Sequence, residues 1–414
     1  MKLYPHQIEA LEAVKLFNRC AFYADMGLGK TFMGSEKANS FSQKILVVCQ
    51  KSKIQDWIDH FTEYYGMDVF DLAVKKQLPQ YLAMIGKCVG VINYDLVYRR
   101  KELEAMNDFT LMLDESSIIQ NETTKRAKFI LKMHAANVIL LSGTPISGKY
   151  EFLWSQIHLL GWPISKNLYW QQYIITEWVD QGGFMVPRVA GYRNVDRLKE
   201  KLAEYGAVFQ KSEEVFDLPD QIFQDIRMPT TKEYRKFQKE KIITVDGKEL
   251  VGDTSLTAML YERMLCGSYN QNKLDAFRDL LESTNGRLIV FYNFNAELDA
   301  LRVIANDLNR PHGAVNGDER NLKPYEEAEN SITFVQYQAG SKGLNLQLAN
   351  RVVYFTPTLS CENWMQSQKR IHRIGQDKTC FYYRLTCRNS IEERIYASLQ
   401  RGVDYTDKLF EKEG

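Results

Sequence analysis

The stretch Ala24-Asp-Met-Gly-Leu-Gly-Lys-Thr31 follows the apolar run Ala21-Phe22-Tyr23, and together they predict a strand, a phosphate-binding turn and a helix. Glycines and small residues let the backbone wrap around phosphates, with amide groups pointing inward at the start of a helix. Lys30 can reach the β- and γ-phosphates, and the Thr31 hydroxyl suits Mg²⁺. Alanine replaces the usual first glycine of such a turn. The predicted nucleotide-binding residues are Asp25, Met26, Gly27, Leu28, Gly29, Lys30 and Thr31.

An acidic pair, Asp114-Glu115, follows the apolar run Phe109-Thr-Leu-Met-Leu113. A phosphate-binding turn of this kind needs a carboxylate on a neighbouring strand to hold Mg²⁺. We expect Asp114 to bind the metal and Glu115 to polarise the attacking water. Acidic pairs also occur at solvated strand ends, so this prediction depends on the position of the pair after the turn.

Hydroxyl groups follow a third apolar run, Val138-Ile-Leu-Leu141, which continues as Ser142-Gly-Thr144-Pro. Hydroxyls at this point can bond to the acidic pair and sense whether a γ-phosphate is present. We therefore expect Ser142 and Thr144 to couple the acids to the nucleotide. The alternative is an ordinary turn after a strand, because glycine and proline are turn residues.

Basic residues are concentrated in the segment Trp364–Gln376, which we predict to be helical as far as Arg373. Gln366, Arg370 and Arg373 then lie at i, i+4 and i+7, on one helix face. Planar guanidinium groups suit the charge on a transferring γ-phosphate, so this face predicts a phosphate clamp. A solvated basic face is the alternative. These arginines can act only if a second lobe closes over the first.

Short apolar runs recur in two groups, one before about residue 145 and one after about residue 285. Runs with little alternation are typical of strands that are covered on both faces, as in a parallel sheet. The runs are Ile45–Cys49, Cys88–Ile92, Leu111–Leu113, Val138–Leu141, Leu288–Tyr292, Ile332–Val335, Val352–Phe355 and Phe381–Leu385. Helical patterns such as Ala296–Leu308 and Ile391–Leu399 lie between them, so the expected fold class is α/β.

The stretch between the two groups is different, with four tryptophans in residues 151–180 and charged, helical patterns in residues 195–215 and 230–265. We expect a first lobe at residues 1–215, with a helical insertion at about 151–215, and a linker with a second lobe at residues 216–414. The tryptophan-rich stretch is expected to pack on the first lobe. Its alternative is a strand-separating or partner-binding element, although no wedge hairpin is evident.

The composition, 45% hydrophobic and 25% charged, is that of an ordinary soluble protein. No run approaches the about eighteen apolar residues of a membrane span, so no membrane partner is expected. The net charge of +1 gives nucleic-acid binding no support, so any basic track must be local. The seven cysteines form no Cys-x-x-Cys pair, which argues against structural zinc and indicates the reduced thiols of a cytoplasmic protein.

In their order along the chain, these motifs resemble those of the superfamily-two helicases, and within them the Swi/Snf-like remodelling ATPases. The resemblance covers nearly the whole chain, and Arg370-Ile-His-Arg373-Ile-Gly-Gln376 is nearly diagnostic of the Swi/Snf-like branch. It implies two RecA-like lobes, ATP and Mg²⁺ as cofactors, and translocation on double-stranded DNA. Single-stranded DNA or RNA is the alternative substrate.

The resemblance also implies further site residues. Leu3-Tyr-Pro-His-Gln7 is similar to the motif whose glutamine reads adenine, which points to Gln7. The segment Gln338–Leu346 is similar to the second-lobe motif that touches both DNA and nucleotide, which points to Gly343 as a nucleotide contact. Gln366 is a further predicted nucleotide contact. The implied nucleic-acid contacts are Lys51, Ser52, Lys53, Tyr94, Gln338, Ser341 and Lys342.

The sequence departs from the family pattern in two places. Ser116-Ser117 follows the acidic pair, where alanine and histidine are usual, and Leu359-Ser-Cys361 stands where Trp-Asn-Pro is usual. The first departure leaves open how the acids couple to the hydroxyl motif. A nearly bare motor of prokaryotic or viral origin is expected. Two alternatives stay open: a helicase that separates DNA or RNA strands, and a nucleotide-gated clamp or scaffold that hydrolyses slowly or not at all.

Overall fold

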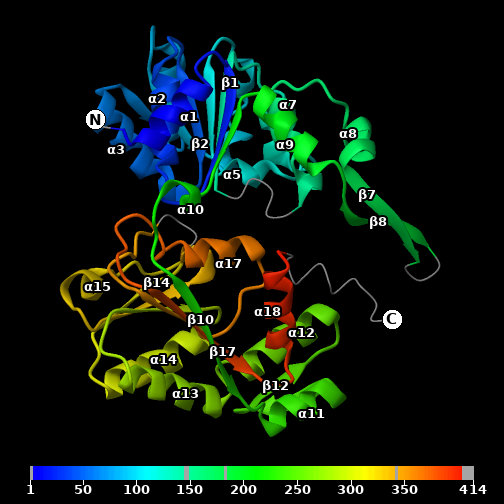
Figure 1. The fold of residues 1–414 in the computed structure, drawn as a ribbon, viewed down its shortest axis with the longest axis vertical. Coiled ribbons are helices and arrows are strands. Elements are labelled where there is room, and N and C mark those ends of the chain that lie inside the picture. The colour runs from blue at the N-terminus through cyan, green and yellow to red at the C-terminus, as the bar shows by residue number, and fades with distance from the viewer. Residues whose placement is uncertain (1–2, 144–148, 181–183, 341–343, 403–414) are drawn as a thin grey trace. The chain divides into compact units, whose positions relative to one another are not determined.

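The computed structural model describes residues 3–143, 149–180, 184–340 and 344–402. The chain divides into two compact units, Met1–Phe216 and Asp217–Gly414 (Figure 1). Each unit is built around one parallel sheet, so the predicted α/β class with two RecA-like lobes is confirmed. Among the described residues, no helix has the length and apolar character that crossing a bilayer requires.

The first unit contains a seven-stranded sheet with the order β3-β4-β2-β5-β6-β1-β9, and all neighbouring strands are parallel. Its strands are β1 (Arg19–Ala24), β2 (Ile45–Cys49), β3 (Val69–Asp71), β4 (Val89–Asn93), β5 (Thr110–Asp114), β6 (Asn137–Ser142) and β9 (Ala207–Gln210). The central strands are buried on both faces, which explains why their sequences show little alternation.

Helices cover both faces of this sheet, and each face has its own apolar core. One core packs Phe22, Val47 and Ile139 against α1, α2 and α3, and the other packs Leu46, Leu113 and the neighbouring strands against α5 to α9 (Figure 1). The helices are α1 (Pro5–Ala13), α2 (Lys30–Asn39), α3 (Ile54–Tyr65), α4 (Leu78–Ala83), α5 (Tyr94–Val97), α6 (Lys125–Leu131), α7 (Trp154–Leu159), α8 (Lys166–Tyr173), α9 (Val195–Glu204) and α10 (Ser212–Val215).

The register of this sheet brings three sequence motifs to one edge. Phe22 of β1 and Asp114 of β5 both pair with Leu141 of β6, and Tyr23 pairs with Ser142. Since the strands are parallel, their carboxyl ends lie side by side. The glycine turn, the acidic pair and the start of the hydroxyl motif therefore follow neighbouring strands at the same edge.

The second unit contains a six-stranded sheet with the order β10-β17-β16-β13-β15-β14, again parallel throughout. Its strands are β10 (Gln221–Met228), β13 (Leu288–Tyr292), β14 (His312–Val315), β15 (Ile332–Gln336), β16 (Arg351–Tyr354) and β17 (Cys380–Cys387). Its helices are α11 (Lys232–Glu240), α12 (Ser255–Cys266), α13 (Gln271–Glu282), α14 (Asn295–Asp307), α15 (Lys323–Glu327), α16 (Tyr337–Gly340), α17 (Cys361–Gln368) and α18 (Ile391–Gln400). One continuous apolar core joins them.

The middle of the chain is less helical than the sequence patterns predict. The expected helical insertion also holds an antiparallel hairpin, β7 (Ile174–Asp180) with β8 (Met185–Tyr192), and strand β9. The stretch 230–265 holds a second hairpin, β11 (Ile242–Val245) with β12 (Lys248–Val251). Isoleucine, valine and tryptophan favour strands in the first hairpin, and Asp246-Gly247, both with positive φ, make the tight turn of the second.

Candidate nucleotide and nucleic-acid site

The glycine turn joins β1 to α2 with two glycines in the left-handed region, Gly27 at φ 94° and Gly29 at φ 78°. A side chain at Gly29 would be strained, and its Cβ would lie 2.1 Å from the Gln7 amide nitrogen. Only glycine therefore fits between Gln7 and the start of α2. The resulting turn, closed at the first residue of a ten-residue helix, has the backbone form that a phosphate-binding loop requires.

Gln7 and His6 of α1 bond to the backbone of the turn. The Gln7 amide nitrogen donates to Leu28 O over 3.1 Å, and His6 Nε2 lies 2.9 Å from the same oxygen. Gln7 Oε1 accepts from the Tyr4 backbone amide, so the buried carboxamide links the first helix to the turn. This places the predicted adenine reader directly beside the phosphate-binding residues.

Lys30 is the first residue of α2, and its ammonium group lies inside the turn. Nζ donates to Ala24 O over 2.8 Å and to Asp25 O over 3.3 Å. Thr31 follows it on the exposed side of the helix. Gly143, after β6, is close to the lysine, because a Cβ there would lie 3.2 Å from Lys30 Nζ.

The acidic pair is held by two aromatic side chains. The Trp57 indole N–H donates to Asp114 Oδ2 over 2.9 Å, and the Tyr94 hydroxyl donates to Asp114 O over 3.0 Å. Burial raises the pKa of Asp114 above its usual value, whereas the Trp57 bond and the charges of Lys30 and Lys53 lower it. Glu115 adopts a left-handed conformation at φ 55°, which is strained for a residue with a side chain and is typical of functional sites.

The hydroxyl motif and the acidic pair share a buried neighbourhood. Ser142 ends β6 with no exposed surface. Ser116, directly after the acids, donates to Gln156 Oε1 over 2.7 Å, and the Tyr23 hydroxyl donates to the same oxygen over 3.0 Å. Thr144, the other predicted coupling residue, lies outside the described residues.

The predicted nucleic-acid contacts differ in their surroundings. Lys51 is exposed, and Lys53 forms an ion pair with Asp56 at 2.5 Å, next to the half-buried Ser52. Gln338 is exposed on α16. Tyr94 is 3% exposed with its hydroxyl on Asp114 O, so its side chain supports the acids rather than facing solvent. Three residues of the second-lobe motif lie outside the described residues: Ser341, Lys342 and Gly343.

The prediction that Gln366, Arg370 and Arg373 share one helix face is wrong, because α17 ends at Gln368. Tertiary bonds replace the helix beyond that point. Arg370 O accepts from the Leu346 amide, and the Gln376 side chain donates to Gln347 O, Ala349 O and Ile371 O. These bonds hold the segment in a folded loop.

In this loop the two arginines have different surroundings. Arg370 is 2% exposed and donates to Leu344 O over 3.2 Å, while burial lowers the pKa of the half-buried Arg373. Gln366 is buried at the end of α17 and donates to Glu362 Oε1 over 3.0 Å. The second unit therefore holds Arg370 buried and Arg373 half-buried, in a loop that is bonded to the segment before β16.

Family relationships agree with this arrangement. Residues 6–273 match the SNF2-related domain, and residues 272–375 match the helicase conserved C-terminal domain. The first match covers more than half of the chain. This chain belongs to the SNF2-related family. The family predicted from the order of the motifs is confirmed.

Several members of the SNF2-related family are similar over most of this chain. Protein CHROMATIN REMODELING 24 of Arabidopsis thaliana is 25% identical over 95% of this chain and 45% of its own length. The ISWI chromatin-remodeling complex ATPase ISW2 of Saccharomyces cerevisiae is 21% identical over 90% of this chain and 37% of its own length. The mouse DNA annealing helicase and endonuclease ZRANB3 is 24% identical over 98% of this chain and 40% of its own length. The chain spans less than half the length of these curated relatives.

A solved structure, the Sulfolobus solfataricus SWI2/SNF2 ATPase core in complex with dsDNA, aligns with all of this chain and 94% of that chain. The sequence identity is 19% and the TM-score is 0.45.

The side chain of Gln156 explains the main local departure from the SNF2-related pattern, and no motif in the sequence points to it. Ser116 stands where the family usually has alanine, and in a fully buried position its hydroxyl needs an acceptor. Gln156 of α7 provides it and also accepts from Tyr23, one residue before the turn. The signal in the sequence was a hydroxyl at a site where the family usually has none.

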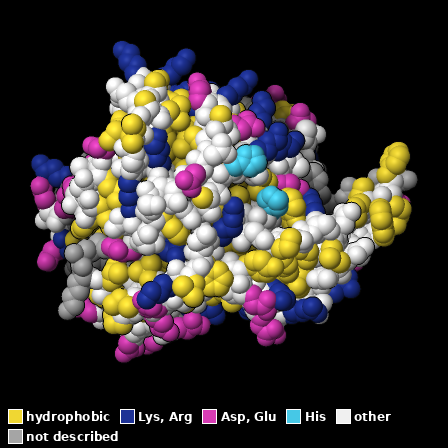
Figure 2. Space-filling view, turned by 90° about the horizontal axis from the view of Figure 1, so that it is seen from above, with side chains coloured by type: hydrophobic (Ala, Val, Ile, Leu, Met, Phe, Trp, Pro, Cys, Tyr) yellow, Lys and Arg dark blue, Asp and Glu magenta, His cyan; other side chains and the backbone are white. Residues whose placement is uncertain are grey.

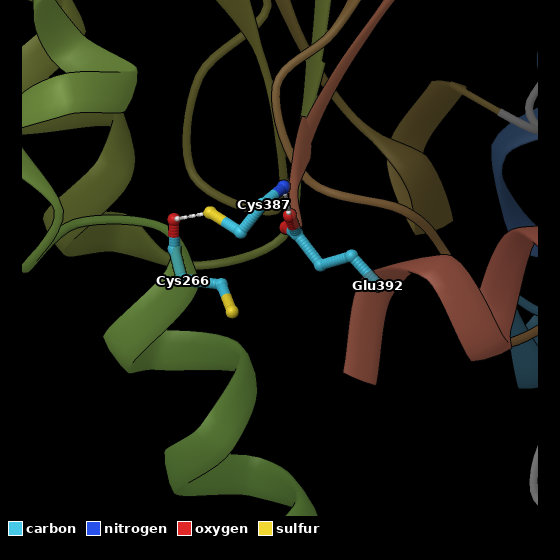
Figure 3. Close-up of side chains that lie close together, drawn as sticks. All are labelled: Cys266, Cys387 and Glu392. Carbon is cyan, nitrogen blue, oxygen red and sulfur yellow. Dashed lines mark hydrogen bonds between the residues drawn. The ribbon is translucent and has the colours of Figure 1, made fainter. Parts of the chain in front are cut away.

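A second polar cluster lies in the core of the second unit and has a different character. The ligand atoms of Cys266, Cys387 and Glu392 lie within 4.8 Å of one another (Figure 3). Glu392 Oε1 is 2.5 Å from the buried ammonium of Lys273, and Oε2 accepts from the Cys387 amide over 2.9 Å. A metal cation here would have to displace the ammonium group, so we assign this cluster to the core.

Proposed function

We propose that this chain hydrolyses ATP and uses the cycle to translocate on double-stranded DNA. The observation that carries the proposal is the common edge of the first sheet. There the Lys30 turn, the Asp114–Glu115 pair and Ser142 follow adjacent parallel strands, in a chain of the SNF2-related family. The chain spans less than half the length of these curated relatives, so the activity of the whole protein belongs to the same proposal.

In this proposal the turn residues Asp25 to Gly29 wrap the phosphates, and Gln7 reads adenine. Lys30 exchanges its bonds to the Ala24 and Asp25 carbonyls for bonds to phosphate oxygens, whose negative charge makes them the stronger acceptors. Thr31 and Asp114 would hold Mg²⁺, whose role is to neutralise phosphate charge. Glu115 orients the attacking water.

The second unit supplies the remaining groups. Arg370 and Arg373 stabilise the transferring phosphoryl group, with Gln366 and Gly343 as further nucleotide contacts. Ser142 and Thr144 couple the nucleotide state to the acids. Closure of the lobes on ATP and reopening after hydrolysis then moves the grips on the DNA backbone.

Those grips are phosphate contacts, so no sequence specificity is expected. Tyr94, which the family resemblance also implies as a DNA contact, is proposed instead to support the acidic pair through its hydrogen bond to Asp114 O. The proposed direct contacts are Lys51, Ser52, Lys53, Gln338, Ser341 and Lys342.

The test is steady-state ATP turnover with duplex DNA, single-stranded DNA and RNA, for the wild type, Lys30→Ala and Glu115→Gln. We expect duplex DNA to stimulate most strongly, and each variant to lose about 100-fold or more of the turnover, since a single preorganised charge-stabilising group is worth about 10²–10³-fold. Lys15→Ala, at an exposed ion pair with Glu12, is the matched control and should turn over like wild type.

Unchanged turnover in both site variants contradicts the motor. Negligible turnover of the wild type with every nucleic acid, together with nucleotide-dependent DNA binding, supports the clamp instead.

A further inference from the structure

The hairpin β7–β8 is a two-stranded ribbon with little support from the rest of its unit. In its two strands only Ile174 is buried. Figure 1 shows it extending away from α8 and α9, from which the chain enters and leaves it. An isolated two-stranded ribbon is marginal in water, and exposure on both faces gives it no core to protect. This makes a contact outside the unit the simplest reason for its presence.

The end of the ribbon that is farther from the sheet carries large apolar side chains. Trp178 is 64% exposed, Phe184 is 76% exposed and Met185 is 58% exposed. Trp178 pairs with Pro187, and Met185 pairs with Asp180 two residues along β7, so the tryptophan and the methionine lie on one face. In Figure 2 the projection at the right of the view is covered mainly by hydrophobic side chains. Grouped apolar exposure of this kind marks an interaction site.

Charge changes sign along the ribbon. The described strand residues carry Glu177, Asp180 and Arg188, one net negative charge, so the apolar end is not a phosphate grip. The segment from Arg193 to Lys201, which follows the ribbon, contains four cationic and two acidic residues and so has a net charge of +2.

One hydrogen bond and the charges around Tyr173 place this positive charge at the end of the ribbon next to α8 and α9. Arg193 donates to Ile174 O over 3.2 Å, at the first residue of β7. Burial raises the pKa of Tyr173, the residue before Ile174, and the nearby charges of Arg197 and Lys201 lower that pKa. The hairpin is therefore flanked by positive charge next to α8 and α9 and is aromatic at its far end.

We infer that the apolar end of the β7–β8 hairpin stacks on the exposed face of a base pair where a DNA duplex opens into single strands. The positively charged segment that follows the hairpin then lies beside the flanking phosphates. This rests on the proposed function, because a motor that moves along double-stranded DNA meets a junction wherever its duplex track ends in single strands. Bases stack well on aromatic side chains, and apolar wedges enter base steps in other DNA-binding proteins. A partner protein with an apolar surface would account for the aromatic end of the hairpin but not for the positive charge at its other end. Nucleic acid accounts for both observations.

The experiment compares a forked duplex with a blunt duplex of the same paired length, using the full chain. The variant Trp178→Ser/Phe184→Ser removes both rings, and Leu16→Ser/Ile85→Ser is its control, because those side chains are 94% and 95% exposed elsewhere on the unit. Stacking is worth about 1–3 kcal/mol per base, so we expect the hairpin variant to lose about 5- to 150-fold in affinity for the fork. Its affinity for the blunt duplex should change less than about 2-fold.

A 2-aminopurine at the junction gives a second readout. Its fluorescence should change when the wild type binds, not when the hairpin variant binds, and should change again with Trp178→Phe/Phe184→Tyr, which keeps both rings.

Equal affinity of wild type and hairpin variant for the fork overturns the inference and assigns the end to a protein surface. Equal losses on fork and blunt duplex overturn it as well, because the hairpin is then a general DNA grip. Failure of duplex DNA to stimulate the wild-type ATPase is a separate result that bears on the proposed function alone.

Discussion

Among the lysines whose charge acts on a buried acid, Lys30 and Lys273 have different surroundings. Lys30 of the first unit is partly exposed, and its described hydrogen bonds go to the carbonyls of Ala24 and Asp25. Lys273 of the second unit has no exposed surface and contacts the carboxylate of Glu392 at 2.5 Å. The first ammonium group can exchange its partners for a phosphate, and the second can exchange nothing without leaving a buried charge.

The acids differ in the same way. Asp114 is held at its carboxylate by a neutral indole and lies at a sheet edge beside a glycine turn. Glu392 is neutralised by the ammonium and bonded to the backbone of β17. Proximity of opposite charges thus does not identify a binding site. What separates the two is whether the bonds that position each charge leave it available to a ligand.

The largest expected effect comes from breaking the buried pair. Lys273→Met leaves Glu392 without its counter-charge in the core and should lower the free energy of unfolding by about 3–5 kcal/mol. Lys30→Met removes bonds to neutral carbonyls and a positive charge near Asp114, but at a partly exposed site, so it should lower that free energy by less, about 1–3 kcal/mol. Urea unfolding of both variants measures the difference.

The double variant Lys273→Met/Glu392→Leu is the control for this comparison. It removes both charges and should recover most of the lost stability, since an apolar pair of similar size often replaces a buried ion pair at little cost. Equal destabilisation by Lys273→Met and Lys30→Met would remove the distinction between the two clusters.

The parts of the fold that could be predicted from the sequence are those whose burial leaves a continuous or periodic apolar pattern. The apolar strands of both sheets were predictable, and β2 and β13 have the predicted ends, because burial on both faces leaves continuous runs. The α14 and α18 helices were predictable from their periodicity. The residues of the glycine turn and the acidic pair were predictable because each follows such a strand.

The remaining features depend on contacts that a sequence pattern does not contain. The Arg370–Arg373 segment has a helical pattern, but bonds from Gln376 and Leu346 end the helix at Gln368. The β7–β8 ribbon has no buried face, so it has no alternation of buried and exposed residues to reveal it. The hydrogen bond from Trp57 to Asp114 crosses 57 residues and could not be predicted from spacing.

A smaller effect is expected at the bond that links the acidic pair to α7. Gln156→Leu removes the acceptor that Ser116 and Tyr23 share, and leaving buried hydroxyl groups without a partner costs about 1–3 kcal/mol. Ser116→Ala alone should cost less, and the double variant should cost less than the sum of the two single changes. Urea unfolding in a double-mutant cycle measures this coupling, expected at about 0.5 kcal/mol or more. Strict additivity would mean that Ser116 and Gln156 do not depend on each other.

The smallest expected effect, and the sharpest test of the difference between the acids, is a change of pH profile. The Trp57 indole donates to Asp114 Oδ2 and lowers the pKa of that carboxyl, against the rise caused by burial. In the proposed function Asp114 must be ionised to hold Mg²⁺, so ATP turnover should fall as the pH falls through this pKa. Trp57→Phe keeps the ring and removes the donor, which raises the pKa further.

The acid side of the turnover profile should therefore move to higher pH in Trp57→Phe, while turnover at alkaline pH changes little. Trp162→Phe is the matched control, because that ring stacks on Tyr205 with centroids 5.6 Å apart and should leave the profile in place. An equal loss of turnover at every pH in Trp57→Phe would show that the indole acts through packing alone. The charge of Asp114 would then be set by burial and by Lys30 and Lys53, and the neutral donor would no longer distinguish this acid from Glu392.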